Sequence, residues 1–72
     1  MTKFEALSEL DQATLLAVML DMIRRANCHS IDTLAQKEKR SVAEIWREVC
    51  KEAGLQECSF PADLPRQMNG RN

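Results

Sequence analysis

Four side chains in this sequence are soft or borderline ligands of the kind that zinc prefers: Cys28, His29, Cys50 and Cys58. Zinc sites usually place their ligands in pairs two to four residues apart, and the three cysteines show no such spacing. Cys50 falls within a helical pattern of apolar residues, where a free cysteine is usually a small buried side chain. His29 is expected to be exposed in a connector. The sequence therefore predicts no metal site and no cofactor.

Catalysis by a cysteine would need an imidazole beside the thiol and a third group to orient that imidazole. Only Cys28 neighbours the single histidine, His29, and both residues are expected in a connector. The sequence has no Gly-rich phosphate loop, and 72 residues are too few to enclose a pocket of the usual ligand size. We therefore expect a protein that is not an enzyme.

The composition restricts the class of protein further. Hydrophobic residues make up 44% of the chain and charged residues 29%, which is typical of a globular domain. Ten basic residues face eleven acidic ones, so no overall charge attracts nucleic acid or an anionic membrane. Three cysteines are an odd number for a disulfide framework. With neither a signal-peptide pattern nor an apolar run of about 20 residues, we expect a cytoplasmic protein without a membrane partner.

Basic side chains nevertheless gather in one part of the chain. Residues 24–51 contain seven basic and four acidic residues, a net charge of +3. Lys37, Lys39 and Arg40 form a small cluster there, and Arg47 follows in the next expected helix. These four side chains could contact the phosphates of a nucleic acid. The alternative is a solvated corner between two helices, and the sequence leaves both interpretations open.

The elements that would position these residues are helices, and the longest is expected near the start of the chain. Ser8 and Asp11 have the spacing of a helix cap. Leu, Met and Ala, which favour helices, dominate the apolar run LLAVML at residues 15–20. Neither Gly nor Pro interrupts residues 8–27. The pattern predicts a helix from about Glu9 to Asn27.

This first helix is apolar around most of its circumference. A stripe facing the core would need residues 16, 19, 20 and 23, and further apolar side chains lie beside that stripe. A helix with this pattern is normally covered on more than one side. A chain of 72 residues is short for such coverage. We therefore expect the surplus face to bind a second copy or a larger protein, through Leu15, Val18, Met19 and Met22.

Two shorter helices are expected in the middle of the chain. Apolar residues at i, i+3 and i+4 predict a second helix that begins at about Ile31 and ends at Lys37 or Glu38. The third is expected at residues 42–53, where Ser41 and Glu44 have the spacing of a reciprocal capping box. Gly54 follows at the position where helices often end in a left-handed residue.

The two ends of the chain are expected to differ. Thr2 and Glu5 have capping-box spacing and predict a short helical turn before the first helix. After residue 55 the helical period stops and two prolines prevent a continuous helix. The predicted fold class is all-α: a three-helix small domain at residues 1–55 with an irregular, Pro-containing tail at residues 56–72. Within the tail, the apolar side chains that could pin it to the core are Phe60 and Leu64.

The segments SIDTLA (residues 30–35) and SVAEIWR (residues 41–47) resemble a helix-turn-helix of the tri-helical kind, such as sigma-factor region four. Ser41 would cap the recognition helix, and Lys39 stands where the turn usually has Gly. The resemblance implies a DNA-binding regulator that contacts DNA through Lys37, Lys39, Arg40 and Arg47. A second similarity, to ribbon-helix-helix repressors, would make residues 18–23 an intersubunit strand.

Two functions follow from these patterns. The first is a small non-enzymatic regulatory or interaction protein that acts through an apolar helical surface, as a homodimer or docked on a larger protein. The alternative is a helix-turn-helix-like DNA-binding transcriptional regulator. Both could hold together, because readers of this kind are usually dimers.

Overall fold

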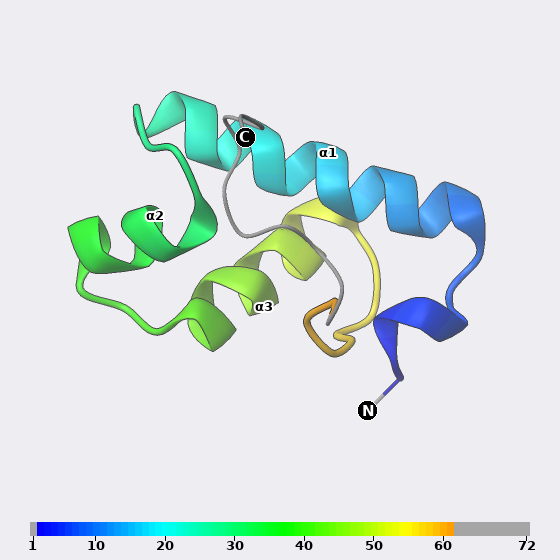
Figure 1. Cartoon of the computed structure of the whole chain (residues 1–72). Helices are drawn as coiled ribbons and strands as arrows, with labels where there is room; N and C mark the ends of the chain where they lie inside the picture. Colours follow the sequence, from blue (N-terminus) through cyan, green and yellow to red (C-terminus); the bar gives the residue numbers. More distant parts are fainter. Residues whose placement is uncertain (1, 62–72) are drawn as a thin grey trace.

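The computed structural model describes residues 2–61 of the chain. Its elements, in order, are η1 (Phe4–Ala6), α1 (Glu9–Arg25), α2 (Ile31–Glu38) and α3 (Val42–Ala53) (Figure 1). The described residues contain no strand beyond an isolated parallel bridge between Thr2 and Cys58. The predicted fold class is therefore confirmed: residues 2–61 form a small all-α domain of three α-helices.

The helices are arranged with α1 on one side and everything else on the other. In Figure 1, α1 runs along the top of the molecule, while η1, α2 and α3 lie below it. Helix α3 packs against both other helices and occupies the middle of the fold. As a result, one side of α1 lies against the core and the opposite side has no described element over it.

Local signals set both ends of α1. The Asp11 amide donates to Ser8 Oγ at 3.1 Å, which is the predicted cap. At the other end Asn27 adopts a left-handed conformation with φ of 57°, and the Cys28 amide donates to the Ile23 carbonyl at 3.0 Å. The helix therefore ends just before the predicted position at Asn27. Residues 18–23 lie inside α1 and do not form the strand implied by the ribbon-helix-helix similarity.

The core side of α1 overlaps only in part with the predicted stripe. Leu15, Met19 and Ile23 are buried at i, i+4 and i+8, whereas Leu16 and Leu20 are only partly buried. The prediction was right for residues 19 and 23; Leu16 packs against the edge of the core, whereas Leu20 does not belong to the core cluster. The other helices contribute these buried residues to the same core: Ile31, Leu34, Ala35, Ile45, Trp46, Val49 and Cys50.

Serine caps begin the two shorter helices. At α2 the Thr33 amide donates to Ser30 Oγ at 3.2 Å and the Ser30 amide donates to Thr33 Oγ1 at 3.0 Å, a reciprocal capping box. At α3 the Glu44 amide donates to Ser41 Oγ at 3.1 Å. The Glu44 carboxylate does not complete the predicted box, because it lies 3.8 Å from Arg40 Nε instead.

Trp46 of α3 joins the two ends of the described chain to the helices. Its ring makes edge-on contacts with Phe4, at a centroid distance of 6.0 Å, and with Phe60, at 5.2 Å. Its Nε1 donates to the Cys58 carbonyl at 2.9 Å. The core therefore extends past residue 55, and Phe60 pins the following segment as expected; Leu64 lies outside the described residues.

The first turn forms where it was predicted, but its cap is different. Lys3, not Thr2, precedes η1, and no side chain caps the turn. Thr2 pairs with the other end of the described chain, where the Ser59 amide donates to the Thr2 carbonyl at 2.9 Å. The Phe4 amide donates to Ser59 Oγ at 3.1 Å. Because Lys3 holds the N-cap position, Thr2 lies one residue too early to form a capping box with Glu5.

Candidate interaction surfaces

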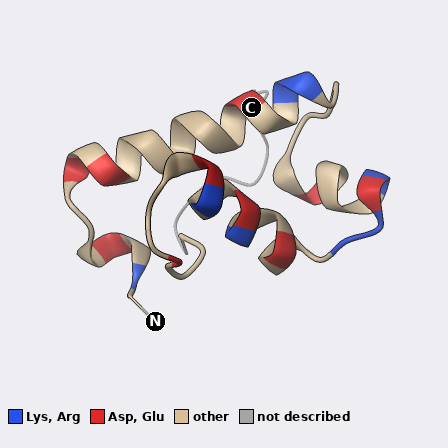
Figure 2. Ribbon diagram, turned by 180° about the vertical axis from the view of Figure 1, so that it is seen from behind, with Lys and Arg blue, Asp and Glu red and all other residues tan. Residues whose placement is uncertain are grey.

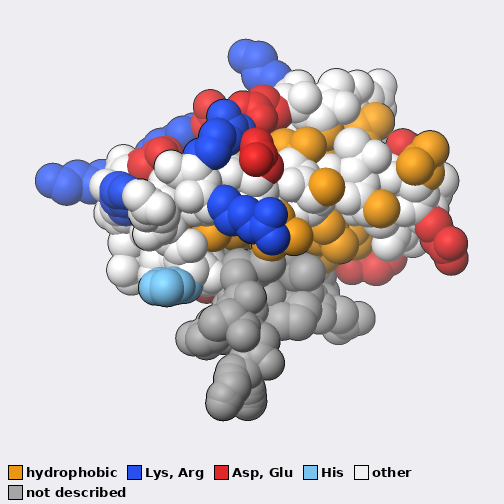
Figure 3. All heavy atoms as spheres, turned by 90° about the horizontal axis from the view of Figure 1, so that it is seen from above, with side chains coloured by type: hydrophobic (Ala, Val, Ile, Leu, Met, Phe, Trp, Pro, Cys, Tyr) orange, Lys and Arg blue, Asp and Glu red, His pale blue; other side chains and the backbone are white. Residues whose placement is uncertain are grey.

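The side of α1 that faces away from the core carries an apolar stripe made of Leu10, Ala13, Ala17 and Leu20, which we call the outer stripe. These positions alternate in steps of three and four residues, so they line one side of a helix. Leu10 is 75% exposed, the one large hydrophobic side chain so exposed among residues 2–61. Both alanines are exposed and Leu20 is partly exposed. Figure 3, which looks onto this side, shows hydrophobic side chains spread along it.

The interface predicted from the sequence lies on a different side of the helix. Leu15 is 0% exposed and Met19 is 2% exposed, so both are core residues that a partner could not contact in this fold. Val18 and Met22 are partly exposed and pack against the edge of the core. Burial therefore removes Leu15 and Met19 from the predicted interface, and the exposed apolar side chains of α1 lie instead in the outer stripe.

Charged residues bracket the outer stripe. Glu9 begins α1 and Arg24 lies in its last turn, and both are exposed. Within residues 2–61 neither takes part in an ion pair. Arg25, the neighbour of Arg24, is engaged: it lies 3.0 Å from Asp21 and 3.3 Å from Glu52. The ends of the stripe therefore carry opposite charges that nothing in the described chain neutralises.

Among the predicted nucleic-acid-binding residues, Arg40 is the most fully engaged. Its Nη1 donates to Glu48 at 2.6 Å and to Glu38 at 3.3 Å, and its Nε lies 3.8 Å from Glu44. The hydrogen bond to Glu48 is the main cause that raises the pKa of Arg40 above its ordinary value. Three carboxylates surround this guanidinium, so an incoming phosphate would have to displace them.

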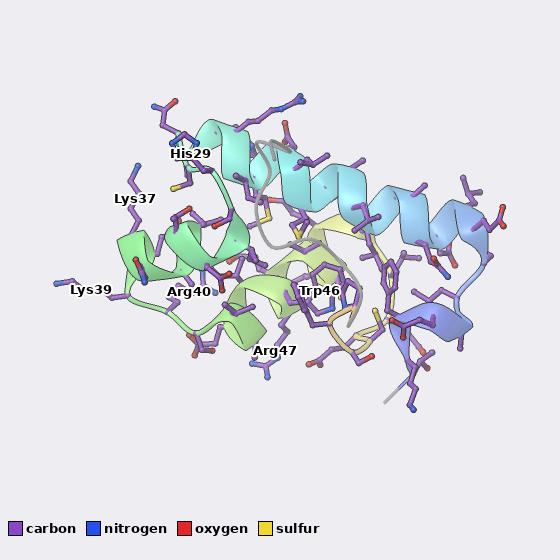
Figure 4. The ribbon with its side chains drawn as sticks, viewed as in Figure 1. His29, Lys37, Lys39, Arg40, Trp46 and Arg47 are labelled. Atoms are coloured by element: carbon purple, nitrogen blue, oxygen red, sulfur yellow. The ribbon has the colours of Figure 1, made fainter. Side chains whose placement is uncertain are left out.

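The other three predicted residues point in different directions. Lys37 Nζ donates to the Ala26 carbonyl at 2.6 Å, at the end of α1, and Arg47 Nε donates to Glu57 at 3.0 Å. Figure 4 shows Lys39 extending away from the fold at the turn between α2 and α3, with Lys37 above it and Arg47 farther away along α3. The structure does not bring the four cations together on one surface.

The exposed side of α3 carries charges of both signs. An open groove there is lined by Arg40, Glu44, Arg47, Glu48 and Lys51. Figure 2 shows basic and acidic residues alternating along α3, while α1 is uncharged over most of its length. Neither a cysteine nor the histidine lines this groove, and its carboxylates Glu44 and Glu48 are both close to Arg40.

The cysteines do not form a site with His29. Cys50 and Cys58 are each 2% exposed, whereas Cys28 is partly buried in the connector and His29 is exposed. Burial, with the neighbouring Cys50 thiol, raises the pKa of Cys58 to about 11, so this thiol stays protonated at neutral pH. Within the described part of the chain, no three metal-ligating side chains gather at one point. Sequence reasoning missed the burial of Cys58 because no helical period covers that residue.

Two further findings bear on function. None of the helices formed by residues 2–61 is long and apolar enough to cross a lipid bilayer. Comparisons of the chain with protein-family models, with curated proteins and with solved structures find no match. Functional inference must therefore start from the two exposed surfaces, the outer stripe of α1 and the charged side of α3.

Proposed function

We propose that this chain is a small non-enzymatic interaction protein that binds another protein through the outer stripe of α1. One observation carries the proposal: four apolar residues line the exposed side of a helix whose opposite side already fills the core. Exposed helix surfaces are normally polar, and contiguous apolar surface on a small domain is typical of a binding site. Between Glu9 and Asp21 the sequence of α1 has one charged residue, Asp11. Asp11 lies toward the core side of the helix and outside the stripe.

The test is capture of partners from a native lysate by the tagged full chain, with and without nuclease treatment. Ala17→Glu places a carboxylate in the middle of the outer stripe at an exposed helical position, where Glu is a good helix former. Ala43→Glu makes the same change at an exposed position of α3 and serves as the matched control. Circular dichroism of both variants establishes that the helices remain.

We expect Ala17→Glu to lose the captured partner and Ala43→Glu to retain it, with no effect of nuclease. Equal capture by both variants would refute the proposal. Capture that disappears only after nuclease treatment would favour the second candidate function.

That second candidate is a DNA-binding regulator, and one observation favours it. Lys39 separates α2 from α3 in a left-handed conformation with φ of 57° and ψ of 43°. The helix-turn-helix resemblance places Gly, the residue that adopts this conformation most readily, at the same position. The engagement of Arg40 and Arg47 by carboxylates counts against this candidate, which is why we place it second.

Fluorescence anisotropy with mixed genomic DNA fragments tests this candidate. If it is correct, affinity should fall steeply as salt rises from about 50 to about 200 mM, because phosphate contacts release counterions. Lys39→Gln should weaken that binding across all sequences. Absence of binding at the lower salt concentration would eliminate the DNA-binding function.

A further inference from the structure

We infer that the partner of the outer stripe is a second copy of this chain, bound with its α1 antiparallel to the first across a twofold axis. The inference rests on the proposed function, because it names the occupant of the same surface. It follows from three properties of α1: the spacing of its exposed apolar residues, the charges at its two ends, and its position in the fold.

The spacing of the outer stripe suits two copies of the same helix. Leu10, Ala13, Ala17 and Leu20 alternate in steps of three and four residues, the repeat with which two helices pack side by side. With the axis between Ala13 and Ala17, Leu10 of one copy lies beside Leu20 of the other. Ala13 then lies beside Ala17. The small residues allow close approach at the centre, and the leucines close both ends.

The end charges select the antiparallel arrangement. Each α1 begins with Glu9 and has Arg24 in its last turn, and neither has an ion-pair partner within residues 2–61. In this register Glu9 of each copy lies opposite Asp21 of the other, whose charge is paired with Arg25 of its own helix, and within about one helical turn of the unpaired Arg24. A parallel pair would instead place Glu9 beside Glu9. Because a twofold interface repeats each contact, two complementary ion pairs form at once.

The position of α1 leaves room for this partner. In Figure 1 the rest of the described chain lies on the other side of α1, and Figure 3 shows the outer stripe uncovered by any described element. An unrelated apolar helix could also lie on the stripe, but the unpaired charges at both ends match those of the chain itself. One helix pair is small beside a standard interface of about 1,600 Å², so we expect a dissociation constant that is about micromolar or weaker.

Sedimentation equilibrium of the purified full chain, from low micromolar to millimolar concentration, tests the inference. We expect the mass to rise from 8.2 kDa toward twice that value. Ala17→Glu should remain at the monomer mass over the same range, whereas the control Ala43→Glu should follow the unchanged protein.

Charge reversal then tests the orientation. Glu9→Arg and Arg24→Glu should each raise the dissociation constant about three- to tenfold, because each single change brings like charges together twice. The double variant restores opposite charges at both contacts and should return to within about twofold of the unchanged chain. Measurements at about 1 M salt should reduce these differences.

The outcomes separate this inference from the proposed function. A chain that stays monomeric at every concentration, but loses a captured partner with Ala17→Glu, would overturn the dimer and leave the proposed function standing. A dimer unaffected by Ala17→Glu would overturn the inference, because another surface would then form the contact. A double charge variant that associates more weakly than either single one would overturn the antiparallel arrangement. If the chain neither dimerises nor captures a partner, both the inference and the proposed function are overturned.

Discussion

The outer sides of α1 and α3 are both exposed helix surfaces of one small domain, but they differ in how far their charged side chains are paired. On α3, acidic and basic side chains alternate and neutralise one another, with Arg40 beside Glu48 and Arg47 beside Glu57 (Figure 2). On α1 an apolar stripe separates one exposed acid from one exposed base, and neither is paired within residues 2–61. On the first surface most charges are paired within residues 2–61, with Lys51 as an exception, whereas the second leaves apolar area and charge available to a partner.

This difference changes how a basic cluster in a sequence should be interpreted. Lys37, Lys39 and Arg40 are close together in the sequence, but the fold directs each side chain to a different place. Carboxylates of α2 and α3 surround one of them, and a carbonyl at the end of α1 accepts from another. A count of cations therefore overstates what this surface can offer to phosphates.

The largest expected effect on the free energy of unfolding comes from comparing substitutions on the two sides of α1. Leu15→Ala removes a fully buried side chain and should lower the free energy of unfolding by about 2–5 kcal/mol. Leu10→Ala changes an exposed side chain and should alter it by no more than about 0.5 kcal/mol. Urea unfolding at low protein concentration measures both.

Because a loss of that size can unfold a small domain, Leu15→Met provides the milder core substitution, with an expected cost below about 1.5 kcal/mol. Equal costs for Leu15→Ala and Leu10→Ala would mean that the two sides of the helix are not distinct.

A smaller effect, of opposite sign, is expected in the turn between α2 and α3. Lys39→Gly relieves a left-handed conformation that is unfavourable for a residue with a Cβ and should raise the free energy of unfolding by about 0.5–1 kcal/mol. Asn27→Gly, at the same φ of 57°, is the matched control and should give a smaller gain, because Asn tolerates this conformation better. Thermal unfolding compares the two variants. A loss of stability in Lys39→Gly would show that the lysine side chain itself supports the fold.

The charged side of α3 should respond weakly and in a salt-dependent way. Arg40→Gln leaves Glu38, Glu44 and Glu48 without their shared cation and should lower the melting temperature slightly. Arg47→Gln removes one exposed pair with Glu57 and should have a smaller effect. Both losses should shrink at about 1 M salt because exposed charges are then screened. If the Arg40 loss were unchanged by salt, the carboxylate cluster would not be its cause.

The last test leaves both surfaces unchanged and titrates the core between them. The pKa of Cys58 is raised from 9.0 to about 11, so the folded state holds this proton more tightly than the unfolded state. The stability that this raised pKa contributes is present in full below pH 9 and is lost as the pH rises through 11. The stability difference between the unchanged protein and Cys58→Ala should therefore be constant near neutral pH and shrink above pH 9. A difference that stays constant up to pH 11 would contradict the raised pKa.

The sequence predicts the helix ends better than the helix faces. Ser8, Ser30, Ser41 and Gly54 act within three or four residues of themselves, so their roles follow from local spacing. In contrast, residues 15–20 are all apolar, and a continuous run cannot show which member faces inward. That choice depends on where α3 packs, which is why Leu15 lies in the core in place of Leu16 and Leu20.

The candidate surfaces show the same limit. Leu10 and Ala13 precede the apolar run and carry no signal of their own until the inward side of α1 is known. The partners of Arg40 include Glu48, eight residues away, and that contact depends on the angle at which the turn sets α3. The role of Cys58 could not be predicted from the sequence either. Its backbone carbonyl accepts a hydrogen bond from Trp46 Nε1, twelve residues away in the sequence.

Trp46 is also the single tryptophan of the chain, and its ring touches Phe4 near the start and Phe60 near the end of the described residues. Its intrinsic fluorescence therefore reports a closure that joins residues 55 apart in sequence, as between Phe4 and Ser59. Far-ultraviolet ellipticity reports the coiling of the backbone regardless of that closure. If both signals are followed after a rapid dilution from urea, they would show whether the Phe4 and Ser59 segments come together before or after the helices form.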